Sequence, residues 1–143
     1  MAEVRVTEDL PVSAAKVWEL VRDFGGAQKW LGGLVQKLEL EGEGVGAIRT
    51  ITLPGDTLLH EQLQALDDDE MSFSYAIVRE SPLPTSNYVA NFKLVEMGPE
   101  SCRIEWGSTF EAVGMPEDQV KPMIEGIYTS GIAGLKATLG IQS

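Results

Sequence analysis

The sequence has 143 residues with 22 acidic and 11 basic side chains, which gives a formal net charge of −11 at pH 7. This acidic balance argues against nucleic acids and anionic membranes as partners, because both attract clustered lysine and arginine, and no apolar run approaches the roughly 20 residues that a membrane-spanning helix needs. The length suits one domain with its own core, so we expect a single domain over residues 1–143, without a signal peptide or membrane insertion and located in the cytoplasm.

Alternation of apolar and polar residues predicts a strand near the amino terminus, where Val4 and Val6 are separated by a charged residue. Pro11 interrupts this pattern, and Ser13 is a suitable N-cap for a helix that ends near Phe24, before two glycines. A short helical turn over Ala27–Leu31 is expected to follow.

The middle of the chain has the pattern of a meander of six strands. The segments between them contain the glycine, proline, aspartate and serine residues that turns favour. Such short connections are typical of antiparallel hairpins and too short for parallel crossovers. The predicted strands are Val35–Leu40, Ala47–Leu53, Leu58–Leu66, Met71–Val78, Tyr88–Met97 and Cys102–Val113.

The spacing of apolar residues becomes helical after Gly114, at Val120, Ile124, Ile127, Ile132, Leu135 and Leu139. Pro116 suits the first turn of this helix, whereas Pro122 predicts a kink or a later start. A long amphipathic helix after a curved sheet is expected to lie in the concave face of that sheet, because each must bury its apolar side. The sequence therefore predicts an α+β fold, with a seven-stranded antiparallel sheet around a long C-terminal helix and two short helices after the first strand.

The last helix also carries a row of small residues. Gly126, Ser130 and Gly134 are four apart, and glycine inside a helix costs about 1 kcal/mol relative to alanine. The row predicts either close packing against the sheet or space left for a ligand, and the sequence leaves both open.

Two charged residues fall on the apolar faces of neighbouring predicted strands. Arg49 alternates with Ile51, and Glu61 alternates with Leu59. If Pro54-Gly55-Asp56 forms a three-residue hairpin loop, Arg49 lies directly opposite Glu61, with Cβ atoms about 4.5–5.5 Å apart. An inward ion pair could be purely structural, but burying two charges costs several kcal/mol per ion, so we favour a functional role.

Aromatic residues on the later strands complete the inward-facing set, and Leu63 and Ala65 extend it along the strand of Glu61. Tyr75 and Tyr88 contribute hydroxyl groups, although each could instead pack in the core with its hydroxyl satisfied. An apolar interior with a few convergent polar groups is typical of a small-molecule pocket. The predicted ligand-binding residues are Arg49, Ile51, Leu59, Glu61, Phe73, Tyr75, Tyr88, Phe92, Trp106, Ser108, Ile127 and Gly131.

The composition offers little for metal chemistry. Cys102 and His60 are the single cysteine and histidine, too few for a zinc site without carboxylates. His60 falls on the polar face of its strand, which disfavours a serine–histidine dyad, and Asp67–Glu70 lacks the spaced ligands of a calcium loop and is expected to be a solvated turn. We expect no metal and no cofactor.

Several stretches carry a family resemblance: Pro11–Phe24, Lys29-Trp30, Val45–Thr50, His60–Asp67, Met71–Tyr75, Pro84–Ala90 and Ile104–Phe110. In this order they resemble the START/Bet v 1-like (SRPBCC) superfamily, and most closely its polyketide cyclase/dehydrase and lipid transport branch. The resemblance implies a helix-grip fold, in which the sheet wraps around the last helix and encloses a cavity. Members of the superfamily bind lipids, hormones or polyketides, and some are enzymes.

Within the superfamily the sequence is similar to the lachrymatory-factor synthases, which rearrange a small sulfenic acid. Their pocket arginine, glutamate and tyrosines fall by motif on Arg49, Glu61, Tyr75 and Tyr88, but the flanking residues differ, so the same substrate does not follow. The abscisic-acid receptors share the fold, and their gate and latch would fall at Leu53–Thr57 and Ser81–Thr85. Neither signature sequence is present, and these loops are simply candidates to frame the cavity mouth.

Three functions are compatible with these residues. The first, which we favour slightly, is binding of a small hydrophobic molecule whose carbonyl or oxyanion is held by Arg49, with Glu61 orienting the arginine. The second is a cofactor-independent isomerase, lyase or cyclase, in which Arg49 stabilises developing negative charge, Glu61 moves a proton and Tyr75 or Tyr88 donates a hydrogen bond. The third is a partner protein with a vestigial cavity. We expect a monomer or a weak homodimer.

Overall fold

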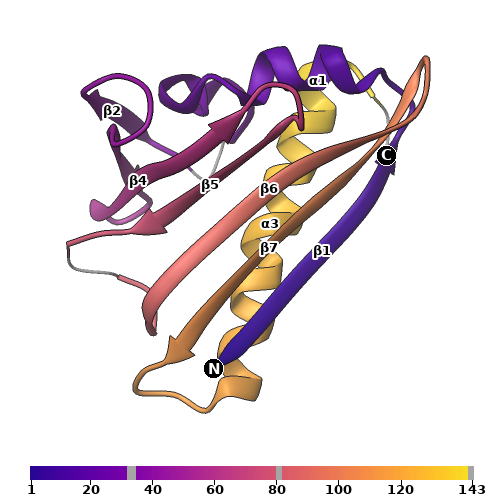
Figure 1. The fold of residues 1–143 in the computed structure, drawn as a ribbon. Coiled ribbons are helices and arrows are strands. Elements are labelled where there is room, and N and C mark those ends of the chain that lie inside the picture. The colour runs from indigo at the N-terminus through magenta and orange to yellow at the C-terminus, as the bar shows by residue number, and fades with distance from the viewer. Residues whose placement is uncertain (32–34, 80–81, 142–143) are drawn as a thin grey trace.

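The computed structural model describes residues 1–31, 35–79 and 82–141, and within them seven strands form one antiparallel sheet (Figure 1). The first strand pairs with the last, so the amino terminus lies along the strand that precedes the final helix. In spatial order the strands are β1 (Ala2–Leu10), β7 (Ser101–Ala112), β6 (Thr85–Gly98), β5 (Ser72–Ile77), β4 (Thr57–Asp67), β3 (Ile48–Leu53) and β2 (Lys37–Glu41). The predicted seven-stranded sheet is confirmed.

The short helices follow β1, as predicted. The Ser13 hydroxyl caps α1 (Ala14–Val21) by accepting a hydrogen bond from the Lys16 amide at 3.3 Å. This helix ends at Val21 rather than near Phe24, because the chain turns into a separate 3-10 turn, η1 (Phe24–Gly26), before α2 (Gln28–Leu31). The extra turn positions the Phe24 ring and carbonyl at the site described below.

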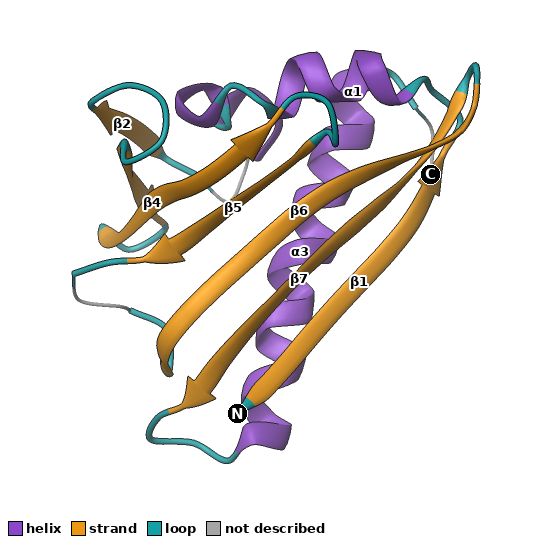
Figure 2. Ribbon diagram, viewed as in Figure 1, coloured by secondary structure: helices purple, strands orange, loops and turns teal. Residues whose placement is uncertain are grey.

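The long helix α3 (Glu117–Leu139) packs along the concave side of the sheet (Figure 2). It buries one apolar stripe, made of Val120, Ile124, Tyr128, Gly131, Ile132 and Leu135. Pro116 is its N-cap and Pro122 lies within it, so the expected later start at Pro122 is wrong. This arrangement confirms the predicted helix-grip architecture.

Of the row of small residues on α3, Gly134 packs against α2 and none packs against the sheet. A Cβ atom at Gly134 would overlap the Trp30 carbonyl oxygen, so the glycine allows the α2 backbone to approach the helix closely. Gly126 and Ser130 are exposed instead. The neighbouring Gly131 faces the sheet, where a Cβ atom would lie 2.9 Å from the Trp106 ring.

The β3–β4 hairpin has the register that the three-residue loop predicts. Leu53 pairs with Thr57, Ile51 with Leu59, and Arg49 with Glu61. Gly55 and Asp56 close the loop with positive φ angles of 87° and 60°, which glycine and aspartate tolerate best. The inward ion pair therefore follows directly from the geometry of this turn.

A bulge changes the pattern further along β4. Leu63 pairs with Tyr75 and Ala65 pairs with Ser74, so Gln64 is an extra residue without a counterpart on β5. Beyond it the alternation reverses: Leu66 lies opposite Phe73 and is half-buried, whereas Ala65 is exposed. The prediction that Ala65 faces inward is wrong for this reason, since a bulge shifts every later side chain by one position.

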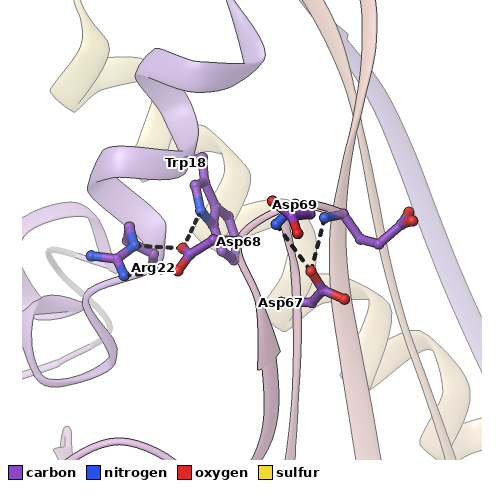
Figure 3. Close-up of polar contacts among 6 residues, drawn as sticks. Trp18, Arg22, Asp67, Asp68 and Asp69 are labelled. Carbon is purple, nitrogen blue, oxygen red and sulfur yellow. Dashed lines mark hydrogen bonds and ion pairs between the residues drawn. The ribbon is translucent and has the colours of Figure 1, made fainter.

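The β4–β5 turn connects the sheet to α1 (Figure 3). Asp68 accepts hydrogen bonds at 2.8 Å from the Trp18 indole and from Nε of Arg22. The Asp67 carboxylate accepts from the Asp69 and Glu70 amides, which forms the turn itself. The segment predicted as a solvated turn is thus a turn that also attaches α1 to the sheet.

Candidate functional site

A cavity of about 230 Å³ lies between the sheet, α2 and α3. Its walls are mostly aromatic and aliphatic. Among the predicted ligand-binding residues, those that line it are Arg49, Ile51, Leu59, Glu61, Tyr75, Tyr88, Trp106 and Ile127. They come from five adjacent strands and α3, because inward alternation on each strand brings its side chains to the same concave face.

The remaining predicted residues lie deeper in the core or behind the wall. Phe73 and Phe92 stack on each other, with ring centroids 5.3 Å apart and an angle of 15° between the rings. Gly131 packs against Trp106, and Ser108 is buried beneath Tyr128. None of these four is among the residues that line the cavity, so they support its walls.

Arg49 and Glu61 form a buried ion pair in the cavity wall. Their side chains are 4% and 8% exposed, and both Nε and Nη2 of Arg49 lie 2.8 Å from the same oxygen, Oε1 of Glu61. Charge-assisted contacts of this length are among the stronger hydrogen bonds in proteins. The pair therefore has one fixed arrangement, with the guanidinium held against β4.

Phe24 fixes the other side of the guanidinium. Nη1 of Arg49 donates to the Phe24 carbonyl oxygen at 3.2 Å, and the guanidinium carbon lies 4.0 Å from the centre of the Phe24 ring and 5.2 Å from that of Tyr75. Cations are attracted to the faces of aromatic rings, and more strongly when water is excluded. The arginine is thus held by a carboxylate, a carbonyl and two rings.

Three tyrosine hydroxyls take part in two separate buried hydrogen bonds. The Trp106 indole donates to the Tyr75 hydroxyl at 3.1 Å, and the Tyr88 and Tyr128 hydroxyls bond to each other. Burial raises the pKa of all three phenols, and the charge of Glu61 raises the pKa of Tyr75 further. Each tyrosine is therefore neutral at physiological pH and can act as a hydrogen-bond donor.

A second bulge aims Tyr88 inward. One extra residue lies on β6 between Ser86 and Val89, and Asn87 adopts a left-handed conformation with φ of 53°. Asparagine tolerates this conformation better than most residues. As a result, Thr85 and Tyr88 are both buried although they are an odd number of positions, three, apart in the chain.

The residues that the sequence reasoning missed at the site include three aromatic residues, Tyr128, Trp30 and Phe24. Tyr128 lies midway between Ile124 and Ile132, and its spacing of four on the predicted apolar stripe was a usable signal. Trp30 lines the cavity from α2, but an aromatic residue in a short helical turn gives no sign of its direction. Phe24 contacts Arg49 through its carbonyl and its ring, which depends on the η1 turn.

The cavity is lined in part by both loops that are candidates to frame its mouth. Leu53, Pro54 and Leu83 line it and are half-buried or exposed. Ser81, at the start of the latch region Ser81–Thr85, lies outside the described residues. That the two loops frame the mouth of the cavity stays a prediction.

Other kinds of site have little support within the described ranges. Among those residues no three His, Cys, Asp or Glu side chains converge as metal ligands. His60 bonds to the Thr50 hydroxyl on the outer face at 2.9 Å, and burial raises the pKa of the Cys102 thiol, which lowers its reactivity. None of the described helices combines the length and apolarity required to cross a bilayer.

Comparison with known proteins places this geometry in a family. The family described as polyketide cyclase / dehydrase and lipid transport matches residues 1–140. Among solved structures, XoxI from Bacillus cereus is 26% identical over 97% of this chain and 96% of its own, with a TM-score of 0.88. An uncharacterised protein from Bacillus thuringiensis is 25% identical over 96% of this chain and 99% of its own, with a TM-score of 0.87.

A more distant likeness concerns the fold alone. Norcoclaurine synthase from Thalictrum flavum, solved with dopamine and hydroxybenzaldehyde, is 22% identical over 99% of this chain and 88% of its own, with a TM-score of 0.80. No curated protein matches the sequence significantly. The match along almost the whole sequence and the helix-grip fold agree: the chain belongs to the polyketide cyclase/dehydrase and lipid transport family.

Proposed function

We propose that the cavity binds a small, mostly hydrophobic molecule that carries a carbonyl or an oxyanion. The observation that carries this proposal is the buried Arg49–Glu61 pair in an otherwise aromatic and aliphatic wall. Ligand pockets typically combine an apolar lining with a few fixed polar groups. A hydrophobic pair would serve the fold at least as well as a buried ion pair, which supports a role for these charges beyond stability.

Arg49 is the proposed anchor for the polar group of the ligand. Among the described residues Nε and Nη2 contact Glu61 and Nη1 donates to Phe24, which leaves one N–H group on each terminal nitrogen for a ligand. A guanidinium donates strong hydrogen bonds to carbonyl and carboxylate oxygens in a site shielded from water. Glu61 balances the positive charge of Arg49, so the polar group of the ligand can be either a neutral carbonyl or an oxyanion with a single negative charge.

The cavity volume limits the size of the ligand. About 230 Å³ is below the roughly 300–1,000 Å³ of pockets that hold drug-sized molecules. This favours a compact molecule of one or two rings over a two-chain lipid. We also propose that the protein is a monomer or a weak homodimer and is located in the cytoplasm.

Native mass spectrometry of gently purified protein, with identification of any released compound, is the first test. The second uses three probes with a similar phenylalkyl body, measured by calorimetry: hydrocinnamate with an oxyanion, benzylacetone with a carbonyl, and butylbenzene with neither. We expect the two oxygen-bearing probes to bind more tightly, and this preference to fall in the Arg49→Leu/Glu61→Leu double variant. Equal affinity of all three probes for the wild type, or a preference of the same size in the double variant, would refute the proposal.

A specific observation also favours catalysis as a second candidate. Both contacts from Arg49 end on Oε1 of Glu61, and within the described residues Oε2 accepts no hydrogen bond. A carboxylate oxygen without a partner beside a cation could take a proton from the carbon next to a carbonyl while Arg49 stabilises the enolate. This would be cofactor-independent isomerase, lyase or cyclase chemistry.

Deuterium exchange separates the two candidates. An enzyme of this kind should accelerate exchange at the carbon next to the carbonyl of benzylacetone in heavy water, and Glu61→Gln should abolish the acceleration while the probe still binds. A binding protein should give the same background exchange in the wild type and the variant. That second result would end the proton-transfer hypothesis.

A further inference from the structure

The indole N–H of Trp30 is a buried hydrogen-bond donor without a partner among the residues that the structure describes. Trp30 is only 2% exposed and lines the cavity from α2. The other two tryptophans are paired, because Trp18 donates to Asp68 and Trp106 donates to the Tyr75 hydroxyl. Buried polar groups are almost always hydrogen-bonded, so an unpaired buried donor in a cavity wall needs an explanation.

The surroundings hold this indole in one position. The α2 backbone packs directly on α3 where Gly134 leaves room, and the Thr138 hydroxyl donates to the Lys29 carbonyl at 3.0 Å. The Trp30 ring meets Trp106 edge to face, with centroids 5.9 Å apart. A donor fixed in this way loses little conformational freedom when it binds an acceptor, which is the advantage of preorganised binding groups.

The protein itself offers few acceptors at this cavity. The Tyr75 oxygen already accepts from Trp106, and the Tyr88 and Tyr128 hydroxyls are bonded to each other. Arg49 contributes N–H groups and no acceptor. Among the described side chains that line the cavity, hydrogen-bond donors therefore outnumber free acceptors, and the carboxylate of Glu61 is the one charged acceptor.

We propose that Trp30 is a ligand-binding residue whose indole N–H donates a hydrogen bond to an acceptor oxygen of the ligand. This inference rests on the proposed function and narrows it. The ligand class becomes an apolar, ring-sized molecule whose oxygens accept hydrogen bonds, as ketones, esters and ethers do, and not one rich in hydroxyl or amino donors. Trp30 selects for the acceptor, while Arg49 and Glu61 supply the charged part of the site.

Indole NMR signals of the full-length chain test this directly. The protein has three tryptophans, so isotope-labelled tryptophan gives three indole N–H signals, which Trp18→Phe, Trp30→Phe and Trp106→Phe variants assign. We expect the Trp30 indole proton to move downfield when benzylacetone binds, as a new hydrogen bond requires, and not to do so with butylbenzene. The Trp18 signal should stay unchanged, because its partner Asp68 lies on the β4–β5 turn.

Affinity gives a second measure. Trp30→Phe removes the donor, so the preference for benzylacetone over butylbenzene should fall roughly fivefold, the effect of one neutral hydrogen bond. The ratio of the two affinities cancels the change in cavity shape, which both probes experience. The matched control, Trp18→Phe, loses an indole outside the cavity and should keep the wild-type preference. If Trp30→Phe fails to fold, the NMR result on the wild type decides.

The outcomes separate the two proposals. Equal shifts of the Trp30 signal with both probes, or a signal already in the hydrogen-bonded range and unmoved by benzylacetone, would overturn the role of Trp30. If the Arg49 Nε–H signal still responds in that case, the proposed function stands without this inference. If no probe changes any signal or binds measurably, the proposed function is refuted and the inference with it.

Discussion

Removal of the Glu61 carboxylate is the sharpest test of the buried pair. In Glu61→Ala the Arg49 guanidinium loses both of its 2.8 Å contacts and stays in a site where its side chain is 4% exposed. Breaking a buried pair from one side costs about 3–5 kcal/mol. Because the Phe24 carbonyl and ring still hold the guanidinium, we expect the lower end, about 3 kcal/mol.

Urea unfolding followed by tryptophan fluorescence measures this loss as a free energy of unfolding. In a chain of this length the same loss should lower Tm by roughly 6–12 °C, at about 2–4 °C for each kcal/mol. The Arg49→Leu/Glu61→Leu double variant should recover most of the stability, since an apolar pair of similar volume needs no compensating charge.

Arg103→Leu serves as a surface control. Arg103 pairs with Asp9 at 2.7 Å, but both side chains are exposed, so we expect almost no change in stability. A loss below about 1 kcal/mol for Glu61→Ala would refute the reasoning, because that is the worth of a hydrated surface pair. A double variant as unstable as the single one would refute it too.

Two further predictions concern pH and helix packing. Burial raises the pKa of Tyr75, Tyr88 and Tyr128, so these phenols ionise at a lower pH in the unfolded chain than in the folded protein. They should therefore leave the stability unchanged below about pH 10. Above that pH the free energy of unfolding should fall, by up to about 4 kcal/mol per pH unit for three groups. Phenolate absorbance should rise together with unfolding, and ionisation of the native protein near pH 10 would contradict this. Gly134→Ala should be strongly destabilising because its Cβ would overlap an α2 carbonyl oxygen, whereas Gly126→Ala, where nothing lies within 4 Å, should stabilise by about 1 kcal/mol. Thermal unfolding compares the two variants, and similar effects on Tm would show that α2 does not pack as described.

Much of the fold and the ion pair could be predicted from the sequence because both depend on local patterns. Alternation with period two gives the strands, and the length of the Pro54–Asp56 loop fixes the register, so Arg49 and Glu61 are placed opposite each other by counting. These features involve residues close in the chain, where turn geometry decides the pairing.

Features that depend on tertiary contacts could not be predicted in this way. The extra residue Gln64 in β4 has no signal in the alternation, so Ala65 was assigned to the wrong face. The contact of Gly134 with α2 joins segments more than a hundred residues apart, and neither alternative predicted for the row of small residues, sheet packing or space for a ligand, included α2. Whether the Trp30 N–H has a hydrogen-bond partner depends on the position of the indole in the folded chain, which no local pattern specifies.

The bulge at Gln64 affects how the sheet tolerates changes in loop length. It divides β4 into two parts with opposite phase. The first part carries Glu61 and pairs with both β3 and β5, whereas the second part carries Leu66 and pairs with β5. Lengthening the Pro54–Asp56 loop by one residue would turn Arg49 away from Glu61 while leaving Leu66 opposite Phe73. The polar end of the cavity can therefore be altered through one loop as a separate module, without rebuilding the core that supports it.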